Sequence, residues 1–400
     1  METHNILDHP VDLLHSTINK TNLHLRRPSV SRVEDRNVVS TTRSRRSVKG
    51  RKSLKRDRLQ QRADWRWKTP LVLIVILLFL YALNPTESNI AYPFLFPSYK
   101  VKGNTHAFAS PEYGKGPRDI AFVAFYTLVL FFAREFIMQE LLRPLAVSLG
   151  ITSRSKQGRF NEQAYVAIYT GIIGPLGLYV MYHSPTWYFS TAGMYADYPH
   201  KTHTAVTKFY YLLQAAFWAQ QALVMILGLE TRRRDFKELV MHHVVTVSLI
   251  ALSYRFHFTM MGVLVYVTHD ISDFFLATSK SLNYIDSPLQ GPYFTLCIVI
   301  WVYLRHYINL KILFSILTEF RTIGPYVLDW EAEHYKWEVS NVITFALLAA
   351  LQALNLFWLY CLLRNAYRFV VLGVAKDDRE EDEDNENDHR GPVAKKWKRV

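Results

Sequence analysis

The stretch MHHVVTVSLIALSYRFHFTMMGVLVYVTHDISDFF, residues 241–275, bears on both the fold and the chemistry of this chain. Most of its side chains are apolar enough for a lipid bilayer, yet it holds three histidines and two aspartates near its ends. Ionisable groups inside apolar helices are costly unless they are paired or wetted. We therefore take them as a candidate functional site, made of His242, His243, His269, Asp270 and Asp273.

The apolar residues of the 400-residue chain collect in blocks long enough to cross about 30 Å of hydrocarbon. This pattern predicts an all-α polytopic membrane protein with about eight transmembrane helices. Both cysteines fall inside the predicted spans, so no disulfide framework is indicated. The spans are expected at 68–85, 118–138, 163–182, 207–228, 239–256, 259–279, 293–316 and 340–372.

The distribution of Lys and Arg predicts that both termini are cytosolic, because basic flanks stay on that side of a membrane. Residues 1–68 hold 17 of these residues, and we interpret 1–66 as a basic, disordered tail. Residues 375–400 form an acidic tail whose Lys396 and Lys398 fit a dilysine retrieval signal of the endoplasmic reticulum. The basic charge adjoins a membrane span and carries no nucleic-acid-binding motif, so nucleic acid is not expected as a partner.

The fifth and sixth spans are joined by a turn near His257, which makes them antiparallel neighbours. Residues whose numbers add up to about 515 then lie at equal depth, so His242 is level with Asp273. With a rise of ~1.5 Å per residue, all five groups fall within about two helical turns. His269, Asp270 and Asp273 can share one helix surface, because they are three and four residues apart. We expect one cluster in the cytosolic half of the membrane.

Three interpretations of this cluster remain open. In the first, a histidine acts as a general base or accepts an acyl group while Asp270 or Asp273 holds its ring. In the second, the groups bind a metal ion, although adjacent His242 and His243 suit a helical metal site poorly and we expect none. In the third, the cluster is a polar packing network. Arg305 lies mid-span and needs a partner, either an aspartate of the cluster or a substrate phosphate.

Two longer segments, RRDFKELVMHHVVTVSLIALSY (233–254) and YVTHDISDFFLATSKSLNY (266–284), resemble the signature of the ceramide synthases, which are membrane enzymes with a TLC domain. The similarity extends to RFNEQAY (159–165), PTWYF (185–189) and Arg305, and the tails resemble those of the fungal branch. It implies that the last six helices form a TLC-type bundle or barrel around an intramembrane cavity. The implied domains are two peripheral helices with a lumenal loop (67–138), a cytosolic linker (139–162) and a TLC catalytic domain (163–374).

The resemblance implies an N-acyltransferase that moves a fatty acyl group from acyl-CoA, as co-substrate, to a sphingoid base, without a further cofactor. The paired histidines of the family correspond to His242 and His243. Its HDxSD box corresponds to His269, Asp270, Ser272 and Asp273. The fungal branch further implies very-long acyl chains, a small single-span regulatory subunit, and pairing with a second copy or a paralogue.

Basic residues before the fifth span are candidates for binding the phosphates of CoA, although such charge also flanks ordinary spans. They include Arg233, Arg234 and Lys237. Other functions stay open at this point: a non-enzymatic TLC-type carrier, sensor or scaffold, a metal-dependent hydrolase or desaturase, and a proton-coupled transporter. The intact HH and HDxSD boxes argue against the first, and the absence of inverted-repeat halves argues against the last.

Overall fold

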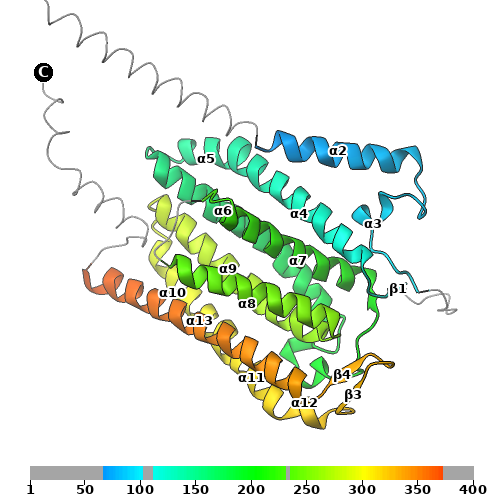
Figure 1. The fold of residues 1–400 in the computed structure, drawn as a ribbon. Coiled ribbons are helices and arrows are strands. Elements are labelled where there is room, and N and C mark those ends of the chain that lie inside the picture. Colours follow the sequence, from blue (N-terminus) through cyan, green and yellow to red (C-terminus); the bar gives the residue numbers. More distant parts are fainter. Residues whose placement is uncertain (1–65, 102–110, 231–234, 373–400) are drawn as a thin grey trace, which may run out of the picture. The chain divides into compact units, whose positions relative to one another are not determined.

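The computed structural model describes residues 66–101, 111–230 and 235–372. The expected tails, 1–66 and 375–400, lie outside these residues except for Arg66. A helix occupies each of the eight stretches in which a span is expected (Figure 1). These helices are α2 (Lys68–Leu83), α4 (Arg118–Phe136), α6 (Arg154–Tyr182), α7 (Ala205–Ile226), α8 (Phe236–Arg255), α9 (Thr259–Tyr284), α10 (Gln290–Trp301) and α13 (Glu338–Leu372).

Two of these helices continue through a π-helical turn into a further α-helix. The first runs from α4 through η1 (Ile137–Leu142) into α5 (Arg143–Ser148). The second runs from α10 through η4 (Val302–Ile308) into α11 (Asn309–Leu317), and η4 holds the predicted site residue Arg305. Such turns widen a helix locally and often occur at functional sites.

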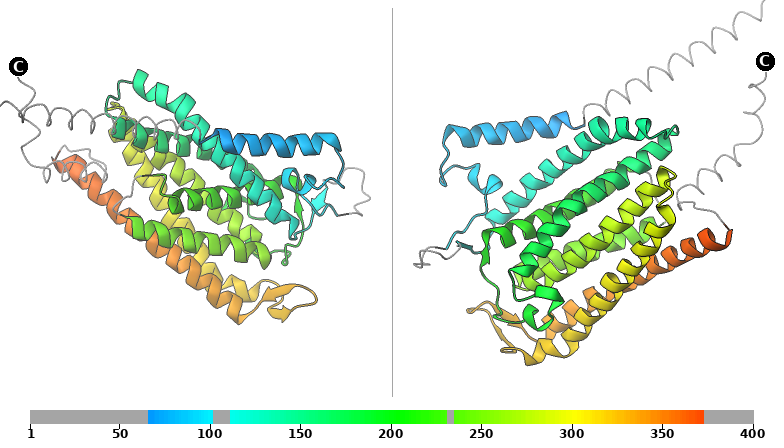
Figure 2. Two further views of the ribbon diagram at one scale, coloured as in Figure 1. Left: turned by 45° about the horizontal axis from the view of Figure 1, so that its top comes forward. Right: turned by 180° about the vertical axis from the view of Figure 1, so that it is seen from behind.

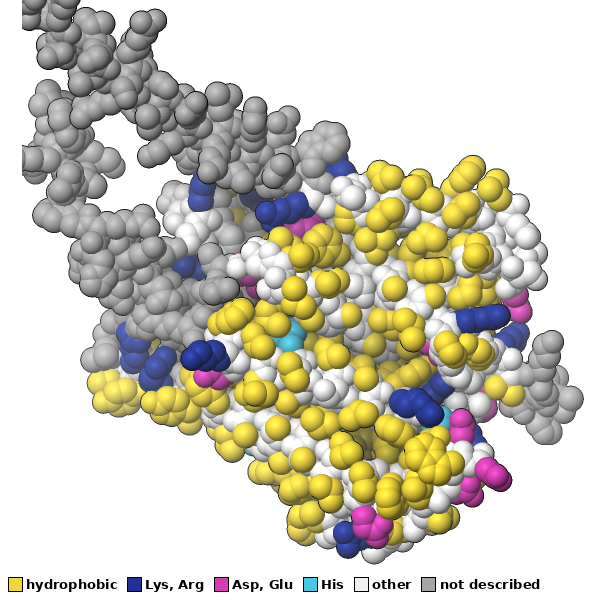
Figure 3. Space-filling view, in the orientation of Figure 1, with side chains coloured by type: hydrophobic (Ala, Val, Ile, Leu, Met, Phe, Trp, Pro, Cys, Tyr) yellow, Lys and Arg dark blue, Asp and Glu magenta, His cyan; other side chains and the backbone are white. Residues whose placement is uncertain are grey.

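Within the described residues, six helical segments are long and apolar enough to cross a membrane: α4–η1–α5, α6, α8, α9, α10–η4–α11 and α13. Helix α2 is shorter, with 16 residues, and α7, which carries Lys208 and three glutamines, is not among the six. Figure 3 shows apolar side chains across the middle of one face, with charged side chains toward its edges. The chain is therefore a polytopic all-α membrane protein, as predicted, and six of the eight expected spans satisfy length and composition together.

The last six long helices form a ring. Helix α6 packs on α7, α7 on α8, α8 on α13, α13 on α11, α10 on α9, and α9 back on α6 (Figure 2). The turn between α8 and α9 falls where the sequence predicts it, and His257 adopts a left-handed backbone conformation there with φ of 65°. This short connection makes α8 and α9 antiparallel neighbours, so their ionisable side chains face a common interior.

Helix α4 lies outside the ring against α7, and α2 and α3 (Tyr92–Leu95) pack against α4. Two ion pairs fasten α4 to its neighbours. Near its start, Asp119 pairs with the fully buried Lys208 of α7 at 2.7 Å. Near its other end, Arg134 pairs with Glu230, which follows α7, at 2.6 Å. The peripheral position expected for this helix is therefore combined with a firm attachment to the ring.

Short strands close one end of the ring. A hairpin of β3 (Val327–Asp329) and β4 (His334–Lys336) lies between α12 (Glu319–Thr322) and α13, and we call this side of the ring the hairpin end. Strand β1 (Glu112–Tyr113) pairs with β2 (His203–Thr204), and the 3-10 turns η2 (Trp187–Phe189) and η3 (Ala192–Met194) fill the connection between α6 and α7. The sequence pattern did not predict these small sheets.

Candidate active site

Four of the five predicted ionisable groups line one cavity of about 500 Å³, which we call the polar cavity. It lies away from the hairpin end and touches all six segments of the ring. His242 and His243 reach it from α8, and Asp270 and Asp273 reach it from α9. The fifth group, His269, lines a second cavity instead. The structure thus brings together His242, His243, Asp270 and Asp273 and places His269 at a neighbouring space.

The paired histidines have different surroundings. The ring of His242 contacts two indoles, with centroids 5.2 Å from Trp218 and 5.1 Å from Trp358. Its Nδ1 is buried and has no hydrogen-bond partner among the described residues. His243 donates from Nδ1 to the backbone carbonyl of Leu239 at 2.8 Å. Since a carbonyl only accepts, a neutral His243 presents the lone pair of Nε2. That nitrogen is available as a proton acceptor.

His269 of α9 is held in the same way as His243, by a backbone carbonyl of its own helix. Its Nδ1 donates to the carbonyl of Val265 at 2.7 Å. Its Nε2 is buried and has no partner in the part of the chain that the structure describes. In both histidines the carbonyl four residues earlier in the helix orients the ring. The sequence led us to expect that Asp270 or Asp273 would hold a histidine ring, and the contacts formed by His243 and His269 differ from that expectation. The aspartates are engaged elsewhere, because each faces another helix of the ring.

Asp273 is paired with Arg305 of η4 at 2.5 Å. The guanidinium also donates to Ser272 Oγ at 2.6 Å, to Asn355 Oδ1 at 3.2 Å and to the carbonyl of His269 at 3.3 Å. Its flat face lies over Trp301, with the guanidinium carbon 4.3 Å from the ring centroid. Of the two partners considered for Arg305, an aspartate of the cluster is the one present. Ser272, predicted as a substrate-binding residue, accepts a hydrogen bond from Arg305.

Among the residues that the structure describes, Asp270 has no cationic partner of this kind. Its Oδ2 accepts from the hydroxyl of Tyr210 at 3.0 Å and from the amide nitrogen of Gln214, both on α7. Asp270 and Asp273 therefore lie close together on one helix but are held differently, one by neutral donors and one by an arginine.

Comparison with known proteins agrees with this arrangement. The profile of the TLC domain family matches residues 159–364, which contain all five ionisable groups. The chain is 55% identical, over 326 residues, to a sphingosine N-acyltransferase-like protein, FUM17, of Gibberella moniliformis, covering 81% of this chain and 84% of that one. The chain belongs to the ceramide synthase family.

Two yeast relatives are named as a ceramide synthase and a sphingosine N-acyltransferase. The chain is 47% identical to the ceramide synthase LAG1 of Saccharomyces cerevisiae over 323 residues, 80% of this chain and 77% of the relative. It is 45% identical to the sphingosine N-acyltransferase lac1 of Schizosaccharomyces pombe over 330 residues, 82% of this chain and 84% of the relative. The similarity to fungal ceramide synthases suggested by the sequence motifs is thereby confirmed.

The basic residues predicted at the mouth of this ceramide synthase are only partly described. Arg233 and Arg234 lie outside the described residues, and the side chain of Lys237 is exposed and absent from the lining of the polar cavity. Lys280 of α9 and Arg364 of α13 do line it, and our sequence reasoning missed both. Lys280 follows Asp273 by seven residues, a spacing that puts both on one helix face and offered a signal for it.

The metal-binding interpretation finds no ligand set in residues 66–101, 111–230 and 235–372. No three His, Cys, Asp or Glu side chains in this part of the ceramide synthase are grouped so that they could hold a metal ion. The Nδ1 atoms of His243 and His269 are already bonded to backbone carbonyls.

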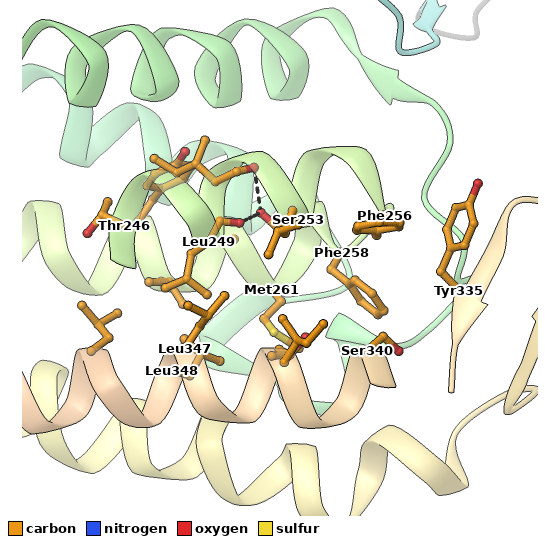
Figure 4. Close-up of a pocket in the computed structure, with 18 of the residues that line it drawn as sticks. Thr246, Leu249, Ser253, Phe256, Phe258, Met261, Tyr335, Ser340, Leu347 and Leu348 are labelled. Atoms are coloured by element: carbon orange, nitrogen blue, oxygen red, sulfur yellow. Dashed lines mark hydrogen bonds between the residues drawn. The ribbon is translucent and has the colours of Figure 1, made fainter. Parts of the chain in front are cut away.

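The second cavity, of about 240 Å³, extends toward the hairpin end, and we call it the apolar cavity. Leucine side chains of α13, among them Leu347 and Leu348, face α8 and α9 across it, as Figure 4 shows. Trp330 and Tyr335 of the hairpin region line its far end. Trp218 lines both cavities, and the ring of His242 contacts Trp218. In this ceramide synthase the paired histidines therefore lie beside Trp218, where the polar and apolar cavities adjoin, and we call this place the cavity junction.

Proposed function

We propose that the protein transfers a fatty acyl group from acyl-CoA to the amine of a sphingoid long-chain base. The observation that supports this most directly is the junction of the two cavities at Trp218 and His242. An acyl thioester has a long apolar chain, a reacting carbonyl and a polyanionic head. An apolar space, a pair of histidines and a polar space lined by Lys280 and Arg364 follow one another in the same order.

In the reaction, the amine nitrogen forms an amide bond with the thioester carbonyl carbon, and the carbon–sulfur bond breaks. The protonated base loses two protons overall, one of which ends on the sulfur of CoA and the other in solvent. Oxidation states do not change and CoA is the leaving group, so the proposed reaction requires no further cofactor.

The histidine pair supplies the proton acceptor. A neutral imidazole is matched to removing a proton near neutral pH. His242 lies beside the cavity junction, and we assign it the direct contact with the thioester carbonyl or the attacking amine. His243 presents Nε2 because its other nitrogen is bonded to Leu239. Transfer through an acyl-imidazole on His242 and direct attack of the amine both agree with this placement.

The finer features carried over from the resemblance belong to this proposal as well. We propose an endoplasmic reticulum membrane protein with both termini in the cytosol, so that the polar cavity faces the cytosolic supply of acyl-CoA. A preference for very-long acyl chains, a small single-span regulatory subunit, and pairing with a second copy or a paralogue are further expectations of the fungal branch.

The test is an acyl-transfer assay on the purified full-length protein in detergent, with sphinganine and a series of acyl-CoAs of increasing length. We expect N-acyl product from the wild type and none from His242→Ala at equal folded concentration, with or without a chelator. Mass spectrometry of the acyl-CoA-treated protein without amine distinguishes the covalent route from direct attack. A folded wild type that forms no product, with its subunit supplied, would instead support a lipid carrier or scaffold.

A further inference from the structure

The two aspartates of the polar cavity differ in how far their charge is already paired within the protein. Asp273 already has a cation, because the guanidinium of Arg305 lies 2.5 Å from its carboxylate. Asp270 has only neutral donors, and both bond to the same oxygen, Oδ2. Among the described residues no donor bonds to its Oδ1, although the side chain lines the polar cavity. One face of Asp270 is therefore held by protein and the other faces the cavity.

The held face is fixed by a chain of hydrogen bonds across three helices. Tyr169 of α6 donates to the amide oxygen of Gln214 at 3.1 Å, which settles which way the amide points. The amide nitrogen of Gln214 is thereby turned toward Asp270 and also toward the Tyr210 hydroxyl, 3.3 Å away. Tyr210 and Gln214 are fully buried, so neither donor can be replaced by solvent.

A glycine makes room for this chain. A Cβ on Gly177 of α6 would lie 2.5 Å from the hydroxyl oxygen of Tyr210, closer than any stable contact. Only a residue without a side chain lets that hydroxyl reach Asp270. Gly174, one turn earlier in the same helix, is different, because a Cβ there would meet nothing closer than Ile271, at 3.9 Å. Of these two glycines, only Gly177 has no room for a Cβ.

An ionised carboxylate at membrane depth needs a cation or a strong set of donors. Two neutral donors on one oxygen leave the other oxygen of Asp270 able to accept from an incoming charged group. The substrate of the proposed reaction brings such a group, the primary ammonium of the long-chain base. A charge-assisted hydrogen bond between these two partners is about twice as strong as a neutral one.

We propose that Asp270 binds the ammonium group of the amine substrate, and that Tyr169, Tyr210, Gln214 and Gly177 are positioning residues that aim its carboxylate. This inference rests on the proposed function. It also gives the two aspartates separate tasks: Asp273 holds Arg305 in the cavity wall, and Asp270 receives the base.

The test measures KM separately for each substrate on the purified full-length protein, with the other substrate saturating. The variants are Gln214→Leu, Tyr210→Phe and Gly177→Ala. Each removes or displaces a donor to Asp270, so we expect KM for sphinganine to rise about tenfold or more, with KM for acyl-CoA within about twofold of wild type. Matched controls are Gly174→Ala on the same helix and Tyr195→Phe, which removes a buried hydroxyl that bonds to Ser315 instead. Both should keep the wild-type KM for sphinganine.

A pair of non-reacting ligands tests the charge itself. N,N-dimethylsphinganine carries a cationic head and cannot become the ordinary amide product, and octadecane-1,3-diol is sphinganine without its amine. Wild type should be inhibited at least about tenfold more strongly by the cation, and Asp270→Asn and Gln214→Leu should lose most of that preference. If the network only stabilises the fold, these substitutions would lower the unfolding temperature and leave the preference for the cation intact.

The outcomes separate the two proposals. A folded wild type that makes no N-acyl product overturns the proposed function. An active wild type whose variants keep the sphinganine KM and the cation preference overturns the assignment of Asp270. Equal increases in both KM values overturn it too, because they would show a general disturbance of the cavity. If Gly177→Ala does not fold, Gln214→Leu and Tyr210→Phe still decide the question.

Discussion

The polar cavity and the apolar cavity adjoin inside one ring of helices, yet they are built on opposite principles. In the polar cavity nearly every ionisable side chain has a fixed partner, such as Arg305 on Asp273 or Leu239 on His243. The apolar cavity is lined mainly by aliphatic and aromatic side chains that impose shape but few directions. The comparison teaches that, if the proposed function holds, reactivity depends on the orientation of polar side chains and binding of the acyl chain depends on cavity volume. Trp218 lines both cavities and therefore lies where the polar lining changes to an apolar one.

The largest expected effect comes from the histidine at that boundary. Replacing His242 with alanine removes the proposed proton acceptor, so we expect kcat to fall by about 10²–10⁴-fold. Single-turnover product formation measures this, with thermal unfolding as the control for folding. Retention of more than a tenth of the wild-type kcat would show that the boundary does not carry the chemistry.

The ion pair that fixes the wall of the polar cavity can be broken without changing a histidine. Arg305→Met leaves the partly buried Asp273 without its cation, and we expect a loss of stability somewhat below the roughly 3–5 kcal/mol that breaking a fully buried pair costs. Arg305→Met combined with Asp273→Leu removes both charges, and we expect the unfolding temperature to recover most of the loss. If the double variant is as unstable as the single one, the ion pair is not what holds η4 against α9.

The volume of the apolar cavity can be reduced at Thr344, which lines it from α13. We expect Thr344→Phe to lower kcat/KM for the longest acyl-CoA about tenfold, because overfilling a packed space costs about 1–3 kcal/mol. Shorter acyl-CoAs and KM for sphinganine should be less affected. A uniform loss across chain lengths, measured with the same acyl-CoA series, would show that this space does not hold the chain.

The smallest effect concerns the hairpin end, which closes the apolar cavity. Lys115 donates to the carbonyl of Tyr254 at 3.3 Å and lies 3.2 Å from Nδ1 of His257, whose Nε2 lies 3.6 Å from Glu333 beside β4. Burial, aided by the nearby charge of Lys208, lowers the pKa of Lys115 from 10.5 to about 7.

Between these two values the unfolded chain holds a proton on Lys115 that the folded chain has released, so folding stability rises with pH from about 7 to 10.5. Lys115→Gln should flatten that rise in thermal unfolding measured across this range. The control is Lys100→Gln, at an exposed lysine that also precedes α4. An unchanged slope in Lys115→Gln would assign the rise to other groups.

The sequence allowed four of the five ionisable groups to be placed together, but it did not predict which neighbour each of them contacts. The antiparallel pairing of α8 and α9 about the turn near His257 correctly predicts that His242, His243, Asp270 and Asp273 share one cavity. It cannot tell what each aspartate faces, because residues three apart on a helix differ by about 60° in direction. That angle separates the Tyr210 side of α9 from the Arg305 side, and the packing of six helices decides it. The π-helical turn that carries Arg305 leaves no readable pattern either.

The partners of Asp270 show a second limit. Tyr210 and Gln214 lie on α7, where aromatic and amide residues are also expected from ordinary packing. The spacing of Gly171, Gly174 and Gly177 is typical of a helix face that allows close approach, but it does not say what approaches. Only the position of the Tyr210 hydroxyl gives Gly177 a distinct role. The β3–β4 hairpin was missed because its strands have three residues each, too short for a periodic pattern.

The attachment of α4 has a consequence for how the chain is made. Asp119 is synthesised well before its partner Lys208, with the whole of α6 between them. Until α7 is made, Asp119 lacks the buried lysine with which it pairs in the folded protein. A nascent chain that stalls between these helices therefore lacks the ion pair that joins α4 to α7. The pairing that fastens α4 also distinguishes a finished ring from an interrupted one.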